Sequence, residues 1–231
     1  MQNADFLKQG NQIMSSTHRQ DHSPKLIHHL SRVSDSIFAL AMALSIVGFD
    51  LPDSVASIND IEVKNFVLTQ LDHLSTYIIT FILLAFYWIE HTQKFSYYKK
   101  SNEIHLLLYL FYLMFIFIIP YSNALITYYP NEAIIKIWYS LNIFLIGLFS
   151  FLTWTHATTE HRLVSAMLDI NHIKAIGIKT LIEPVVSIIT ITIAVAFWDQ
   201  SLWEYTWLLV IILYVIADKL LVKRDKKVEL E

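Results

Sequence analysis

Cysteine is absent from the 231-residue chain, so neither disulfides nor thiolate metal sites can contribute to its structure. Charged residues are also scarce, at 16% of the chain against 55% hydrophobic residues. An average soluble domain carries about 25% charged residues. The sequence contains no internal repeat, low-complexity segment or second soluble domain. This composition predicts a membrane protein built as one compact unit.

Six segments are long and apolar enough to cross a bilayer, which takes about 20 residues each. They cover residues 33–51, 74–95, 104–127, 133–155, 176–198 and 202–221. We therefore predict an all-α membrane protein with six transmembrane helices in one bundle, formed by residues 25–222. Residues 1–24 are polar and lack the apolar core of a cleaved signal peptide, so we expect a cytoplasmic tail there. Residues 223–231 form a basic cytoplasmic tail at the other end.

The distribution of lysine and arginine predicts the orientation of the bundle. These residues concentrate before the first span, after the second, after the fourth and after the sixth. The opposite side of the membrane receives only Lys64 and Lys136. Because cytoplasmic loops carry an excess of basic residues, both termini are predicted to be cytoplasmic.

The first span carries an aliphatic stripe along one helical face. Ile37, Leu40, Leu44, Val47 and Leu51 follow one another at steps of three and four residues. Small residues occupy many of the other positions and let neighbouring helices approach closely. Such a stripe can face lipid, or it can meet copies of itself around a central axis; the pattern alone leaves both interpretations open.

Polar residues mark the beginning of this first span and the end of the second. Arg32, Ser34 and Asp35 lie at the entrance of the first apolar run, and Trp88 and His91 share a face at the end of the second. Buried polar groups in a membrane need partners, so these five residues are predicted to form a structural polar network. Anchoring of Trp88 in the headgroup region is the alternative.

Two other classes of function require patterns that this sequence does not show. Secondary transporters of the cation-diffusion type also have six spans, but they need clustered Asp and His residues at the middle of the membrane, and the sequence lacks this pattern. A membrane enzyme could use His156, Glu160 and His161, but their spacing matches no hydrolase motif. We therefore predict no catalytic residues, no metal site, no cofactor and no nucleic-acid partner.

At Ser34-Asp35 the sequence resembles the transmembrane protein 175 family of lysosomal potassium channels. The first helix of that family carries a phenylalanine-serine-aspartate triplet with an arginine four positions before it. Here Ser34 and Asp35 match, while Val33 and His29 stand at the phenylalanine and arginine positions. Trp88 and His91 at the end of the second span are also similar.

The resemblance implies a homotetrameric potassium-selective channel in the cell membrane, with K⁺ as the permeant ion and no enzymatic activity. The first helices would line a central pore, and its constriction would begin five positions after the aspartate, at Leu40, and continue at Leu44 and Val47. The sequence lacks the Thr-Val-Gly-Tyr-Gly stretch of ordinary carbonyl filters. Rings of aliphatic side chains would narrow the pore instead, and a secondary cation transporter remains the alternative function.

Overall fold

The computed structural model describes residues 23–46, 60–196, 200–210, 212–217 and 219. Every regular element in these ranges is a helix, as the sequence predicts, and an isolated β-bridge joins Tyr98 to Val164. The helices are α2 (Ser23–Leu44), α3 (Asp60–Tyr97), α4 (Glu103–Tyr128), α5 (Ala133–Thr158), the 3₁₀ turn η1 (Thr159–His161), α6 (Ile170–Lys179), α7 (Ile182–Ala196) and α8 (Gln200–Thr206). After α8 the chain is again helical at residues 208–210 and 212–217, and we call this part together with α8 the last helix.

Three segments of the described chain are long and apolar enough to cross a membrane. They are Glu103–Tyr128, Ala133–His161 and Ile170–Ala196, and Leu202–Ala217 is a shorter apolar helix. The predicted spans 33–51 and 74–95 overlap α2 and α3, which also carry charged residues, and positions 47–51 of the first span lie outside the described residues. The six-span bundle with two cytoplasmic termini therefore stays a prediction.

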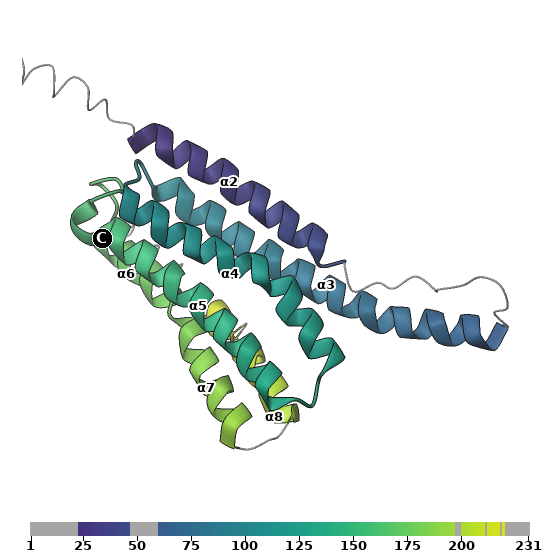
Figure 1. Ribbon diagram of the computed structural model, residues 1–231. Coiled ribbons are helices and arrows are strands. Elements are labelled where there is room, and N and C mark those ends of the chain that lie inside the picture. The colour runs from purple at the N-terminus through teal and green to yellow at the C-terminus, as the bar shows by residue number, and fades with distance from the viewer. Residues whose placement is uncertain (1–22, 47–59, 197–199, 211, 218, 220–231) are drawn as a thin grey trace, which may run out of the picture.

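The helices form an elongated bundle around α4 and α5 (Figure 1). α2 packs against α3 and α4, α7 packs against α5, and α8 packs against α7. We call the end of the bundle near residues 97–103 the α3–α4 end, and the opposite end, near residues 128–133, the α4–α5 end. The first part of α3 extends beyond the other helices (Figure 1). Its 38 residues would span about 57 Å at 1.5 Å per residue, well beyond the apolar thickness of a bilayer.

Local sequence explains where two helices begin. The side chain of Asn102 accepts a hydrogen bond of 2.9 Å from the backbone N–H of His105 and so caps the start of α4. Predicted span 176–198 is divided between α6 and α7, with Thr180 and Leu181 between them. Pro184 lacks the N–H that would continue the helix ladder back to residue 180, and proline is tolerated in the first turn of α7.

The α5–α7 contact is unusually close at Gly147. A Cβ atom on this glycine would lie 2.4 Å from Cδ of Pro184 and 3.0 Å from Cβ of Glu183. Only a residue without a side chain allows the first turn of α7 to approach α5 this closely. Close backbone approach at small residues is a common way to pack helices in membranes.

Candidate functional site

Helix α2 has two different faces. Leu30, Ser34, Phe38 and Ala41 recur at helical spacing and are buried against the other helices. Leu40 and Leu44 lie on the other side and retain 56% and 40% of their surface. Val47 lies outside the described residues. The two described leucines of the predicted constriction are therefore not used by the chain's own core and are available to lipid or to another copy of the chain.

A hydrogen bond joins the polar start of α2 to α3. The indole Nε1 of Trp88 donates to Oδ1 of Asp35 over 2.9 Å. Ser34 is buried but turns to its own helix, where its hydroxyl donates to the carbonyl of Leu30 over 2.7 Å. The side chain of Arg32 is exposed and forms no ion pair within the described residues. Of the five predicted network residues, the structure thus joins Asp35 to Trp88 directly.

His91 lies in a cluster of aromatic side chains that joins α2, α3 and α4. Its Nδ1 is hydrogen-bonded to the hydroxyl of Tyr109 on α4. The rings of Phe38 and Phe95 approach the imidazole with centroid distances of 5.5 Å and 4.2 Å. Sequence reasoning missed Tyr109 because it is one of many aromatic residues in its span, and nothing in the local pattern sets it apart.

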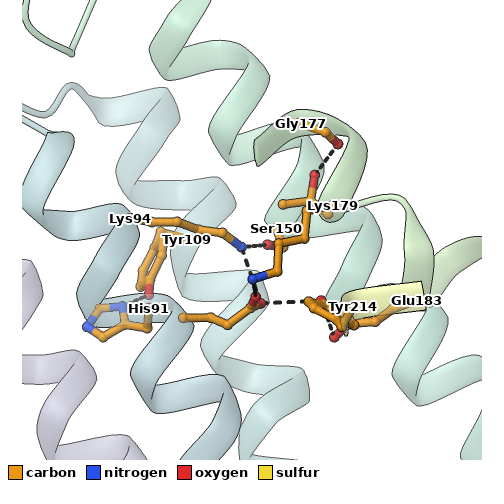
Figure 2. Close-up of polar contacts among 10 residues, drawn as sticks. His91, Lys94, Tyr109, Ser150, Gly177, Lys179, Glu183 and Tyr214 are labelled. Atoms are coloured by element: carbon orange, nitrogen blue, oxygen red, sulfur yellow. Dashed lines mark hydrogen bonds and ion pairs between the residues drawn. The ribbon is translucent and has the colours of Figure 1, made fainter. Parts of the chain in front are cut away.

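A buried ionic cluster (Figure 2) lies on a different face of α3 and begins two residues after Trp88. Its centre is Glu90, which is 7% exposed. Nζ of Lys179 lies 3.2 Å from one carboxylate oxygen of Glu90, and Nζ of Lys94 lies 3.9 Å from the other. Lys94 also donates to the hydroxyl of Ser150 over 2.7 Å. This cluster connects α3 to α5 and to the end of α6.

The cluster continues to α7 and the last helix through Tyr214. The phenolic hydroxyl lies 3.1 Å from Oε1 of Glu183 and 3.3 Å from Oε2 of Glu90, and it can donate to only one of them at a time. A cavity of about 120 Å³ opens beside the two lysines and is also lined by Tyr97 and His172. Sequence reasoning missed this cluster because Glu90 and Lys179 lie on helices that are distant along the chain.

The residues of the enzyme alternative are held apart by separate partners. His156 Nε2 is hydrogen-bonded to Oδ1 of Asn102 at 3.1 Å, whereas Nε2 of His161 is hydrogen-bonded to the carbonyl of Leu168 at 3.1 Å. Glu160 is exposed and has a left-handed backbone with φ of 54°. In the part of the chain that the structure describes, no three His, Asp or Glu side chains are grouped as metal ligands.

Comparison with known sequences finds a family match over the part of the chain that contains most of α2, all of α3 and most of α4. Residues 29–120 match the family model described as endosomal/lysosomal potassium channel TMEM175. A curated potassium channel of Streptomyces collinus is 24% identical over 150 residues, which are 63% of this chain and 71% of that protein.

Two solved structures have a similar fold. One is a lysosomal potassium-selective channel TMEM175 homologue from Chamaesiphon minutus, with a TM-score of 0.68, 17% identity, and coverage of 84% of this chain and 98% of that chain. The other is a variant of the potassium channel MtTMEM175, solved in complex with a nanobody–MBP fusion protein. It has a TM-score of 0.63 and 17% identity, and the match covers 84% of this chain and 93% of that chain.

Proposed function

We propose that this chain is a member of the TMEM175 family and the pore-forming subunit of a potassium channel in the cell membrane. The observation that carries the proposal is the family match over residues 29–120. This segment includes α2, whose inner face is buried and whose outer face exposes Leu40 and Leu44.

We propose further that four copies of the chain assemble around one axis, with the exposed faces of α2 lining the pore. Leu40, Leu44 and Val47 would then form three rings of aliphatic side chains along the pore. Such rings make a narrow constriction that resists wetting, and an ion must lose hydration to pass it. The weaker hydration of K⁺ favours its passage over that of Na⁺.

In this arrangement Asp35 positions the pore helix and does not itself bind the permeant ion. Its carboxylate accepts the hydrogen bond from Trp88 on α3, and this bond fixes the rotation of α2 about its axis. The buried side chains of Ser34 and Phe38 support the same rotation from the inner face. Together these contacts keep Leu40 and Leu44 on the outer face.

Reconstitution into liposomes with K⁺ or Na⁺ gradients tests the proposal. We expect a K⁺ current that exceeds the Na⁺ current and rises with the gradient without saturating as a carrier does. A saturating, strictly coupled flux would instead favour the secondary transporter. The absence of any cation flux from correctly assembled protein would contradict both.

Leu40→Ala tests the constriction, with Leu107→Ala on α4 as the matched control. Both leucines are 56% exposed, so the substitutions remove the same side chain from equally exposed positions. We expect Leu40→Ala to lower the K⁺/Na⁺ permeability ratio and Leu107→Ala to leave it unchanged. If the K⁺/Na⁺ permeability ratio of assembled Leu40→Ala channels is unchanged, Leu40 does not line the pore.

A further inference from the structure

Helix α7 presents a row of polar side chains to the bundle interior. Glu183, Ser187 and Thr190 follow at steps of four and three residues, and all three are buried. Such spacing places them on one helical face, about one turn apart. The last helix contacts Glu183 of this row through Tyr214, and the rings of its Trp203 and Trp207 lie edge to face with each other.

Hydrogen bonds fix the register between these two helices at both ends of the row. Nearer the α4–α5 end, the hydroxyl of Thr190 donates to Ser140 on α5 over 3.0 Å, and the indole of Trp203 donates to the same oxygen over 3.2 Å. Nearer the α3–α4 end, Tyr214 contacts Glu183. An early residue of α7 thus pairs with a late residue of the last helix, so the two helices run antiparallel.

This register places Ser187 and Trp207 at one level between the two bonded levels. Ser187 precedes Thr190 by one turn, and Trp207 follows Trp203 by one turn, so both lie one turn closer to the α3–α4 end. The hydroxyl of Ser187 and the indole nitrogen of Trp207 are both buried, and neither has a hydrogen-bond partner among the described residues. Each is the only polar atom of its side chain.

We propose that this level of the bundle is a binding site for one water molecule, held between the hydroxyl of Ser187 and the indole N–H of Trp207. An indole N–H can only donate and a hydroxyl can accept or donate, so a water that accepts from Trp207 and donates to Ser187 satisfies both. Rotation of Ser187 toward its own helix would satisfy the hydroxyl but leave the indole unpaired. A buried donor without a partner carries the full cost of its desolvation, which drives water into such a site.

The bound water has a structural consequence beyond the two residues that hold it. It would add a third bonded level between α7 and the last helix, between the level at Thr190, Ser140 and Trp203 and the level at Glu183 and Tyr214. The site lies among α5, α7 and the last helix, whereas α2 packs against α3 and α4. It is therefore separate from the face that carries Leu40 and Leu44.

Nuclear magnetic resonance of the ¹⁵N-indole groups in lipid nanodiscs tests the site. The chain has 6 tryptophans, and Trp207→Phe identifies the resonance of Trp207 by its loss. We expect transfer by the nuclear Overhauser effect between water and the indole N–H of Trp207. We expect none at the indole N–H of Trp203, which donates a hydrogen bond to Ser140. The sign of the transfer in a rotating-frame spectrum separates bound water from hydrogen exchange.

Ser187→Ala removes one of the two ligands of the water and should abolish or strongly reduce the transfer to Trp207. Thr192→Ala, at an exposed hydroxyl on the same helix, is the matched control and should leave it unchanged. If Trp207→Phe does not fold, the resonance of Trp207 is identified by elimination, by substituting the other tryptophans with Phe one at a time. A Trp207 indole without transfer from water, or with transfer that Ser187→Ala leaves intact, overturns the proposal.

Discussion

Gly147→Ala is the sharpest test of how closely α5 and α7 pack. The added Cβ would lie 2.4 Å and 2.7 Å from Cδ and Cγ of Pro184 and 3.0 Å from Cβ of Glu183. Ordinary carbon contacts lie at about 3.5–4.0 Å, so α7 must move away by about 1 Å. The pyrrolidine ring of Pro184 is fixed to the backbone in the first turn of α7 and cannot turn aside.

The expected magnitude combines two opposing effects. Overpacking of this kind costs about 1–3 kcal/mol, while replacing a helical glycine by alanine gains about 0.5–1 kcal/mol. We therefore expect a net loss of about 1–2 kcal/mol. At roughly 2–4 °C per kcal/mol for a chain of this size, the melting temperature falls by about 2–8 °C.

Thermal unfolding of the purified protein, followed by tryptophan fluorescence, measures this change. Gly177→Ala on α6 is the matched control, because its added Cβ would make ordinary contacts of 3.6 Å and 3.8 Å with Trp154. The control should be unchanged or more stable by about 0.5–1 kcal/mol. A Gly147→Ala protein at least as stable as the unsubstituted chain would refute the close α5–α7 contact.

Three further predictions concern the polar contacts and the outer face of α2. Asp35→Ala and Trp88→Phe each remove the same hydrogen bond, so a double-mutant cycle measured by thermal unfolding should give a coupling energy of about 0.5–1.5 kcal/mol. Additive losses of stability in the double variant would contradict this hydrogen bond. Glu90→Gln should destabilise the protein by up to about 3–5 kcal/mol because two largely buried lysines lose the carboxylate that pairs with them. Adding Lys179→Met to this variant should restore part of the lost stability. A further loss of stability in the double variant would count against the pairing of Glu90 with Lys179. Leu44→Cys in this cysteine-free chain should let a water-soluble thiol reagent block the current, whereas modification by lipid-soluble reagents alone would place position 44 against the bilayer.

The helices of the central layer could be predicted closely from the sequence. The predicted spans 104–127 and 133–155 correspond to α4 (Glu103–Tyr128) and α5 (Ala133–Thr158). Both consist of long apolar runs with clear boundaries, since Asn102 caps the first and Pro130 lies in the turn before the second. Local sequence decides these elements, and tertiary contacts change them little.

Features that depend on contacts between distant helices could not be predicted in this way. In the sequence Glu90 is a charged residue at the end of a predicted span, and nothing there indicates its partner. Its pairing with Lys179 becomes evident only when the fold brings the ends of α3 and α6 together. Ser34 was predicted to belong to a polar network with Asp35, and the sequence did not indicate that its hydroxyl donates to the carbonyl of Leu30. A serine inside a helix always has its own backbone within reach, and the sequence does not show which partner is used.

The two lysines of the Glu90 cluster differ in when they become available during synthesis. Lys94 follows Glu90 by one helical turn and emerges from the ribosome with it, whereas Lys179 follows by 89 residues. At about 5–20 residues per second, Glu90 waits roughly 4–18 s for this second partner. Its longer contact with Lys94, at 3.9 Å, is thus the pair that can accompany the carboxylate during membrane insertion. The shorter contact with Lys179 becomes possible only after α6 has been synthesised, and the contact with Tyr214 of the last helix comes later still.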